Sequence, residues 1–313
     1  MAHGKSRQTN HRDTISFSNN SIIRMKNILI FGVGLIGGSI ALKSKKTKLF
    51  EQIIAVERKG GTILSPFVES GMLDRLVTNL EDDVALADLI VIATPVSQIS
   101  EILEKIYPYL NSKTLITDVG STKKNVMDDA SKALKEKSIQ FIGSHPIAGS
   151  EKHGPDAAQL NLFEGKNIVL TPTPDTPTLM SEKLNKFWLA MGGSVSIMSP
   201  QEHDEIFSTI SHLPHLLAFS LVNLINNKEK KEVLLNFAAS GFRDFSRIAA
   251  SSPEVWRDIS ISNKDAILID LNLYQQELQK VIALLEGQDQ DGLKKYLTDA
   301  SSTRQNWTDT KIE

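Results

Sequence analysis

The chain contains no cysteine among its 313 residues, and this absence removes several classes of protein at once. Disulfide-stapled folds, thiolate metal centres and cysteine nucleophiles all require that side chain. Hydrophobic residues make up 41% of the chain and charged residues 23%. This is the balance of an ordinary globular protein with ample material for a buried core, so disordered and collagen-like chains are excluded.

Neither charge of one sign nor hydrophobicity is concentrated in long runs. Lys plus Arg number 35 and Asp plus Glu number 37, so the formal charge is −2 and the basic excess of a typical nucleic-acid binder is missing. No uninterrupted apolar run approaches the ~20 residues that span a bilayer. We therefore expect a cytoplasmic protein that binds neither nucleic acid nor membrane.

Residues 1–25 differ in character from the rest of the chain. They hold four basic residues and one acid, and they lack the apolar centre of a secretory signal. A basic, serine-containing segment leaves an organellar transit peptide as an alternative. We expect a leader without regular structure over 1–25, as is common at chain ends.

From residue 26 short apolar runs alternate with helical patterns, and this alternation predicts an α/β domain with a parallel sheet and right-handed crossovers. We expect helices at 36–45, 99–106 and 181–191, and the domain extends to residue 199. The expected strands are 27–31, 53–56, 89–93, 114–118, 140–142, 167–170 and 194–197.

Beyond residue 199 the strand-like runs disappear and helical periodicity dominates. Pro200 stands near the first turn of a helix, where its missing N–H costs nothing. Gly287 and the polar residues after it separate the last two helical patterns. An all-helical domain is expected over 200–313, with helices at 200–226, 230–239, 254–286 and 289–305.

The segment 32–39 (GVGLIGGS) fits the pattern G-x-G-x-x-G directly after a strand and at the start of a helix, as a dinucleotide site requires. Gly32 permits the tight turn, Gly34 lets the backbone approach a pyrophosphate, and Gly37 allows the helix to pack closely on the strand. The open N–H groups and the helix dipole then hold the anion. The sequence therefore predicts a Rossmann-type, doubly wound sheet.

Glu57 follows the second strand, 20 residues after Gly37 (57 − 37 = 20), where an acid binds the ribose hydroxyls of NAD. A carboxylate repels a 2′-phosphate, which favours NAD over NADP, although Arg58 and Lys59 follow at once and could accommodate that phosphate. The expected cofactor-binding residues are Gly32, Gly34, Leu35, Ile36, Gly37, Glu57, Arg58, Thr94 and Pro95.

Two polar clusters follow strands of this domain, where ligands of open α/β sheets bind. Ser121 lies in the segment 118–123 at the end of the strand expected at 114–118, and a helix N-cap is its alternative role. His145 lies in the segment 143–151 after the strand expected at 140–142. A histidine titrates near neutrality and suits proton abstraction from a hydroxyl during hydride transfer, whereas a structural histidine is the alternative.

A third cluster is helical and contains His203, His212, His215, Arg243 and Arg247. His212 and His215 are three residues apart and share a helix face, but a third metal ligand is not evident, so we expect no metal. Either arginine could present a guanidinium to a carboxylate substrate, and an ion-paired surface position is preferred for Arg243. The residues alone predict a nicotinamide dehydrogenase that binds a small hydroxy-carboxylate between the two domains.

Five ordered segments, 32–39, 118–121, 145–151, 211–215 and 241–249, make the chain resemble the prephenate/arogenate dehydrogenases of tyrosine biosynthesis. The resemblance covers residues 26 to about 307, and the segment HPIAG at 145–149 is its most specific part. It implies a homodimer formed through the helical domain. It also implies that His145 and Ser121 act on the ring hydroxyl, and that the substrate is bound by His215, Arg247, Ser150 and Glu151.

The reaction implied by the resemblance is oxidative decarboxylation of prephenate to 4-hydroxyphenylpyruvate, with hydride transfer to NAD. Aromatisation drives the reaction, so the protein mainly positions the reactants and polarises the hydroxyl. Use of arogenate, or of both substrates, is the alternative. A β-hydroxyacid dehydrogenase shares the two-domain plan but its lysine motif is not apparent, and a non-catalytic NAD-binding sensor would not need His145, His215 and Arg247 together.

Overall fold

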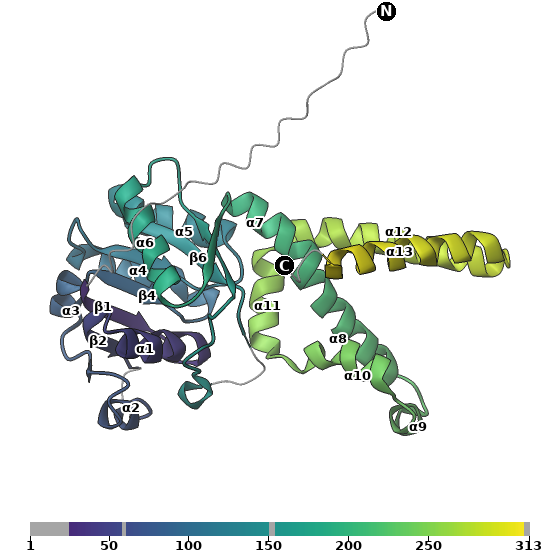
Figure 1. Cartoon of the computed structure of the whole chain (residues 1–313), viewed down its shortest axis with the longest axis horizontal. Coiled ribbons are helices and arrows are strands. Elements are labelled where there is room, and N and C mark those ends of the chain that lie inside the picture. Colours follow the sequence, from purple (N-terminus) through teal and green to yellow (C-terminus); the bar gives the residue numbers. More distant parts are fainter. Residues whose placement is uncertain (1–24, 58–60, 150–153, 310–313) are drawn as a thin grey trace, which may run out of the picture.

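The computed structural model describes residues 25–57, 61–149 and 154–309 of the chain. An α/β part carries the N-terminal two thirds, and a group of helices extends away from it (Figure 1). The described strands are β1 Met25–Phe31, β2 Phe50–Val56, β3 Arg75–Leu76, β4 Leu89–Ile92, β5 Leu115–Asp118, β6 Phe141–Pro146, β7 Asn167–Thr171 and β8 Ser194–Ile197.

These strands form one sheet in the order β3-β2-β1-β4-β5-β6-β7-β8. The strands from β3 to β6 are parallel, and the chain reverses its direction of winding between β1 and β4, which is the position of a ligand crevice in doubly wound sheets. The expectation of parallel strands throughout was wrong at one place, because β6 and β7 pair antiparallel. The chain between them, residues 147–166, contains no described helix longer than a single 3₁₀ turn, so no helical crossover returns it to the starting edge.

Helices cover both faces of the sheet, and successive strand residues point to opposite faces. Ile28 and Ile30 of β1 pack on the side of α1 and α6, whereas Leu29 and Phe31 pack on the side of α3, α4 and α5. These helices are α1 Leu35–Thr47, α2 Ser65–Glu69, α3 Leu80–Leu86, α4 Ile99–Ile106, α5 Lys124–Leu134 and α6 Thr178–Ala190.

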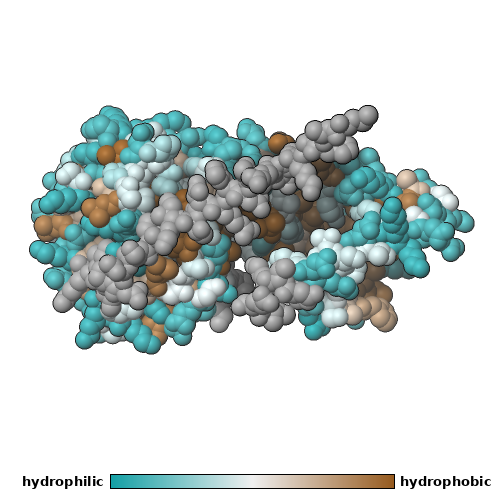
Figure 2. All heavy atoms as spheres, turned by 45° about the horizontal axis from the view of Figure 1, so that its top comes forward, coloured by the Kyte–Doolittle hydropathy of each residue, from teal (hydrophilic) through white to brown (hydrophobic). Residues whose placement is uncertain are grey.

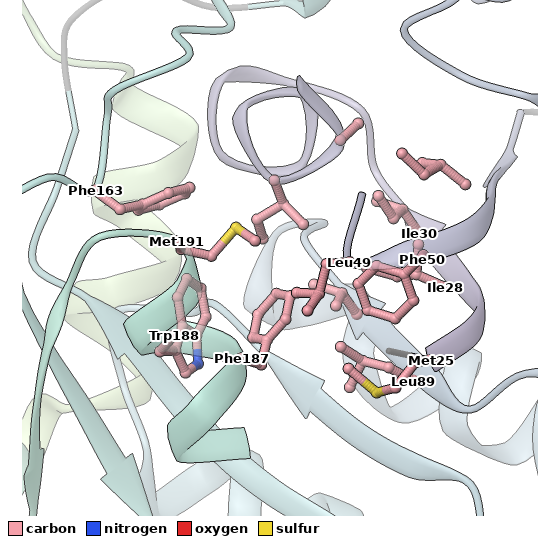
Figure 3. Close-up of a cluster of buried hydrophobic side chains, with 14 of the residues drawn as sticks. Met25, Ile28, Ile30, Leu49, Phe50, Leu89, Phe163, Phe187, Trp188 and Met191 are labelled. Carbon is pink, nitrogen blue, oxygen red and sulfur yellow. The ribbon is translucent and has the colours of Figure 1, made fainter. Parts of the chain in front are cut away.

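The first of these two cores includes an aromatic group around α6 (Figure 3). Trp188 is fully buried, and its ring centroid lies 5.4 Å from that of Phe163 and 5.0 Å from that of Phe187, both with edge-to-face geometry. Trp188 also donates a hydrogen bond from Nε1 to Oγ of Ser144, at 3.1 Å. The core thereby fixes β6 at the residue directly before His145.

The remaining described residues are helical from Pro200 onward. Ser199 caps the first helix by accepting from the N–H of Glu202, and Pro200 takes the first helical position, as expected. The expected helix 254–286 is divided at Asn263. The helical segments are α7 Pro200–Phe207, a π-helical segment Ser208–His212, α8 Leu213–Asn226, α9 Lys231–Asn236, α10 Ser240–Ser246, α11 Pro253–Ser262, α12 Lys264–Glu286 and α13 Gln290–Asp309.

Two features of the fold lie close to the expected domain limits. β1 begins at Met25, one residue before the expected start, and Met25 pairs with Phe50. The last described strand ends at Ile197 and α7 begins at Pro200, so the elements change character where a division was expected. Residues 1–24 of the expected leader lie outside the described part of the chain.

One continuous helical stretch, residues 200–226, is apolar and long enough to cross a membrane by length and composition alone. Its mean hydropathy over an 18-residue window is 1.2, and 17% of that window is buried. Polar residues interrupt it, including Ser208, His212 and His215. Figure 2 shows further hydrophobic side chains on the surface of the helical part, so exposed apolar surface is not peculiar to this stretch.

Candidate active site

The loop between β1 and α1 is shaped by its glycines. Gly32 has φ +85°, and a Cβ atom there would lie 2.7 Å from the carbonyl oxygen of Ala93. A Cβ atom at Gly37 would lie 2.1 Å from the carbonyl oxygen of Gly32, so close packing of α1 on the strand requires glycine. At Gly34 the same atom would meet nothing within 4 Å. Gly34 is the N-cap of α1, which has no side-chain cap, so this helix end can accept an anion.

Two further expected cofactor positions border this loop. Glu57 follows β2, and its Oε1 accepts a hydrogen bond from the backbone N–H of Leu64 at 2.7 Å. Thr94 follows β4, and its buried Oγ1 has no hydrogen-bond partner among the described residues. The backbone nitrogen of Thr94 lies 2.9 Å from the Cβ position at Gly32, and Pro95 beside it is exposed. Arg58 and Lys59 lie outside the described residues.

His145 stands near the end of β6, where the strand extends beyond β5 and pairs with β7 opposite Val169. Its side chain is buried, and its Nδ1 lies 2.8 Å from Nε2 of His203 on α7. The Nδ1 atom of His203 lies 2.7 Å from Oδ1 of Asp204. The ring of Phe207 packs against both histidines. We call His145, His203 and Asp204 the histidine chain.

Asp204 also caps α5. Its carboxylate accepts the backbone N–H of Lys123 at 2.7 Å and that of Lys124 at 2.9 Å, so a residue of the helical part satisfies the start of a helix in the α/β part. The N-cap position of α5 is Lys123. The alternative role of Ser121 as helix N-cap was therefore wrong, because the helix begins two residues later than that role requires.

Beneath the histidine chain lies a buried ion pair. Nζ of Lys123 contacts Oδ2 of Asp118 at 2.5 Å, and both side chains are fully buried. Asp118 also accepts from the N–H of Gly120 and, at 3.1 Å, from the N–H of Ser144. The pair thus joins the loop after β5 to the strand that carries His145.

The electrostatic environment keeps the histidines of this region neutral. Burial lowers the pKa of His145 well below its usual 6.5, and the positive charge of Lys123 acts in the same direction. Burial also lowers the pKa of His203, although its hydrogen bond to Asp204 acts in the opposite direction. The pKa of His212 is lowered to about 4, chiefly by burial. An unprotonated imidazole is the form that can accept a proton.

A cavity of about 440 Å³ opens beside His145. Its walls come from both parts of the molecule, and the polar groups that converge on it are Ser121, His145, Ser211 and His215. Such a concave site with few, convergent polar groups is typical of a small-molecule pocket. The apolar and backbone lining is completed by Ile36, Val119, Pro146, Ile147, Ala148, Gly149, Phe207 and Ile210.

His215 is held in place on α8 by two contacts. Its ring stacks on that of Trp256 of α11, with centroids 3.8 Å apart and planes at 19°, and its Nδ1 donates to the carbonyl oxygen of Ser211 at 2.8 Å. Arg247 begins the 3₁₀ turn after α10 and is exposed, and its positive charge contributes to a lowered pKa at His215, whose largest cause is burial. Arg247 is therefore close enough to His215 to act on its charge, whereas Arg243 is exposed on α10.

Comparison with known proteins identifies the family. The family model for the nucleotide-binding domain of prephenate dehydrogenase matches residues 40–197, and the model for the dimerization domain of the same enzyme matches residues 199–299. The chain belongs to the prephenate dehydrogenase family. The resemblance expected from the sequence and the Rossmann-type fold followed by a helical domain are both confirmed.

Individual members of the prephenate dehydrogenase family match over most of their length. The prephenate dehydrogenase of Bacillus subtilis is 39% identical over 279 residues, which are 88% of this chain and 75% of that protein. The cyclohexadienyl dehydrogenase of Zymomonas mobilis is 31% identical over 89% of this chain and 95% of its own. The prephenate dehydrogenase of Aquifex aeolicus, solved in complex with hydroxyphenyl propionate and NAD+, is 33% identical with a TM-score of 0.84, covering 91% of this chain and 99% of that one.

The fold brings four of the expected site residues to one cavity, and their roles stay predictions. Ser121, His145 and His215 line one cavity, and Ile36 extends the nucleotide loop to its wall. Ser150 and Glu151 lie outside the described residues. The described residues contain no group of three or more side chains that could hold a metal ion.

Sequence reasoning gave no role to three residues of this site. His203 was recognised only as part of a helical cluster, and neither Asp204 nor Trp256 was singled out. The adjacent His-Asp pair at the start of a helix was the available signal for His203 and Asp204. Their partner lies 58 residues away in sequence, and only the packing of α7 against β6 brings them together.

Proposed function

We propose that this protein catalyses the NAD-dependent oxidative decarboxylation of prephenate to 4-hydroxyphenylpyruvate, a step of tyrosine biosynthesis. The observation that carries the proposal is a buried, neutral histidine at the wall of a cavity that the nucleotide loop also borders, in a chain of this family. A base beside a nucleotide site is what removal of a hydroxyl proton during hydride transfer requires. Membership of the family supplies the substrate class.

The nucleotide loop fits NAD. The space at Gly34, the uncapped start of α1 and the buried, unpaired Oγ1 of Thr94 are suited to a pyrophosphate and its neighbouring groups. Glu57, at the end of β2, is placed to bind the ribose hydroxyls. When bound, NAD supplies the acceptor for the hydride. Leu35, Ile36, Gly37, Arg58 and Pro95 complete the proposed contacts.

The chain's own residues then position the substrate and move one proton. His145 accepts the proton of the ring hydroxyl, and Ser121, which lines the same cavity, hydrogen-bonds the same oxygen. His215 and Arg247 bind a carboxylate of the substrate, with the stacked Trp256 restricting the imidazole. Ser150 and Glu151 contact the side chain of the substrate. Loss of carbon dioxide makes the ring aromatic, so orientation is the main task of the protein.

A homodimer is part of the proposal. The second family model describes a dimerization domain, and it covers helices that carry exposed hydrophobic side chains. Phe237, 85% exposed beyond the end of α9, is the most exposed of them. A partner of the same sequence would bury this surface. A cytoplasmic location and the division of the chain at 199/200 remain predictions of the sequence.

The test is NADH formation with prephenate and with arogenate, each offered NAD and NADP separately, with NAD affinity measured in parallel. Turnover of prephenate with NAD is the expected result. A preference for arogenate, or equal use of both, would replace the substrate assignment and retain the mechanism; the cyclohexadienyl relative makes that the second candidate. If neither substrate gives NADH in protein that still binds NAD, the result would contradict the proposal and favour a sensor or a hydroxyacid dehydrogenase.

Arg247 offers a sharper check on substrate binding. Arg247→Ala should raise KM for prephenate by about 10- to 100-fold with little change in kcat, because it removes a charge-assisted contact made equally in the ground and transition states. Arg247→Lys is the matched variant, which keeps the charge and should recover part of the affinity. A fall in kcat at unchanged KM would contradict this role.

A further inference from the structure

The histidine chain gives three of its four ring nitrogen atoms a defined partner, and the fourth is Nε2 of His145. Asp204 accepts two backbone N–H groups as well as contacting Nδ1 of His203, so its carboxylate is surrounded by donors. Burial opposes the ionised form of Asp204, but these donors outweigh it, and its pKa is lowered overall. An ionised carboxylate only accepts hydrogen bonds, and His203 must therefore carry its proton on Nδ1.

The position of the proton on His203 determines the position of the proton on His145. A neutral His203 that is protonated on Nδ1 presents a lone pair at Nε2, and this atom lies 2.8 Å from Nδ1 of His145. The contact is a hydrogen bond only if His145 carries a proton on Nδ1. A neutral His145 then has its lone pair on Nε2, the ring nitrogen not engaged by His203.

We propose that His203 and Asp204 are positioning residues that hold His145 as its Nδ1–H tautomer, so that Nε2 is the atom that takes the proton of the substrate hydroxyl. This inference rests on the proposed function for its substrate, and the tautomer itself does not. In the step, the hydroxyl O–H bond breaks and an Nε2–H bond forms on His145. The Nδ1 proton stays in place, and the resulting imidazolium donates to His203, which Asp204 anchors.

The charged and titratable groups around His145 come from several elements. Lys123 and Asp118 lie beneath it as an ion pair, Asp204 and His203 face it from α7, and His212 approaches from the π-helical segment. The positive charge of Lys123 opposes protonation of His145, whereas Asp204 is the anion connected to His145 through the hydrogen bonds of His203. Removing that path should therefore make the imidazolium harder to form.

The first measurement is the tautomer, by ¹⁵N NMR of histidine-labelled full-length protein, with the His145 signals assigned from the His145→Asn variant. We expect a protonated Nδ1 and an unprotonated Nε2 in the wild type, and a shift toward the Nε2–H form in His203→Phe. An Nε2–H tautomer in the wild type would overturn the inference. This readout needs no turnover, so it remains decisive even if prephenate proves not to be the substrate.

The second measurement is kinetic. His203→Phe should lower kcat for prephenate by about 100-fold, with NAD affinity unchanged, and should move the acid limb of the kcat profile to lower pH. His203→Gln places an amide oxygen within reach of Nδ1 of His145 and should recover at least about tenfold of the loss. Equal losses in the two variants, or an unmoved acid limb, would mean a purely structural role and would overturn the inference.

Ser208→Ala is the matched control. Ser208 is buried one turn along the same helical run and donates to Asp270 at 2.6 Å, away from the histidine chain. The substitution removes a partly buried hydrogen bond of the same helical run and should leave both the His145 tautomer and the acid limb unchanged. A change in either would show that these readouts respond to destabilisation of this helical run, and would contradict the assignment to His203.

Discussion

At the scale of single residues, burial controls what the histidines can do. The imidazoles of His145, His203 and His212 are all at least nine-tenths buried, and each is held in its neutral form. Desolvation penalises the charged form of a base, and the nearby Lys123 adds to this effect at His145 and His203. A general base is useful only while it is unprotonated, so this environment extends the working range of the site toward acid pH.

His145→Asn should lower kcat by ~10²- to 10⁴-fold with little change in NAD affinity, because the amide cannot accept the hydroxyl proton. In the wild type the acid limb should lie below the usual histidine pKa of 6.5, since the folded pKa is depressed. Steady-state rates across the acid range and calorimetric NAD binding provide the measurements. Near-normal turnover by His145→Asn would show that another group is the base.

The same burial has a cost in stability below neutral pH. The pKa of His212 is about 4 in the folded protein against a usual 6.5, so the unfolded chain binds a proton that the folded one does not. The free energy of unfolding should therefore be highest above pH 6.5 and fall as pH drops toward 4. His212 alone accounts for roughly 3 kcal/mol of that loss. Urea denaturation of the wild type and of His212→Gln at both limits tests this, and equal pH dependence in the two would contradict it.

At the scale of elements, two glycines of the loop between β1 and α1 meet different requirements, one for helix packing and one for space beside a ligand. Gly37 is needed for packing, because a Cβ atom would strike the carbonyl oxygen of Gly32, whereas the space at Gly34 is open in the protein alone. The first requirement belongs to the fold and the second to the ligand.

Gly34→Ala should therefore leave the unfolding temperature nearly unchanged and weaken NAD binding by about tenfold or more, since the methyl group occupies space kept for the pyrophosphate. Gly37→Ala is the matched variant and should lower the unfolding temperature, because backbone must move to accept it. Thermal denaturation and NAD titration of both distinguish the two effects. Equal NAD affinity in Gly34→Ala and the wild type would contradict the proposed cofactor site.

The sequence predicted those elements whose signal is local. Buried parallel strands are continuous apolar runs, so β1, β2, β4 and β5 were found close to their true limits. β3 has only two residues, Arg75–Leu76, which is too few to produce a pattern. The break between α11 and α12 at Asn263 was missed because helical periodicity continues through it; Asn263 is held there by donating to the carbonyl oxygen of Asp204.

The candidate site likewise contains residues with a local sequence signal and residues without one. His145 was proposed because it follows an apolar run in the sequence, and the structure places it inside β6, near its end. The nucleotide loop was proposed because its glycines are close together in the sequence. The partners of His145 were not found, since hydrogen bonds between α7 and β6 depend on how two parts of the chain pack. Sequence periodicity does not show that α7 packs against β6.

At the scale of the whole molecule, both parts contribute to one site. α11 contacts the loop after β4 through a hydrogen bond of 2.8 Å from Ser97 to Asp258, and the same helix supplies Trp256 to His215. The α12–α13 hairpin projects away from the sheet (Figure 1), and exposed hydrophobic side chains lie along α9, α12 and α13. Surfaces of this kind on a monomer indicate association.

The wild type should therefore run as a dimer in light scattering coupled to size exclusion. Phe237→Asp should shift the equilibrium toward monomer, because it puts a charge into the proposed apolar contact. Leu86→Asp is the matched control, since Leu86 is 62% exposed on α3 of the α/β part. A monomeric wild type, or dissociation by Leu86→Asp as well, would contradict a dimer formed through the helices.

The π-helical segment Ser208–His212 also determines the angle around the helix axis between the residues before it and the residues after it. His203 and His215 are separated by 12 positions (215 − 203 = 12), which in a regular α-helix would place them ~120° apart around the axis. A π turn closes its hydrogen bond over one more residue than an α turn, and the remaining 11 steps bring the two histidines to within ~20° of each other. One additional residue in the turn thus aligns His203, which contacts the proposed base, with His215 at the wall of the cavity. Deleting a single residue there would rotate one against the other while leaving the chemistry of every side chain intact.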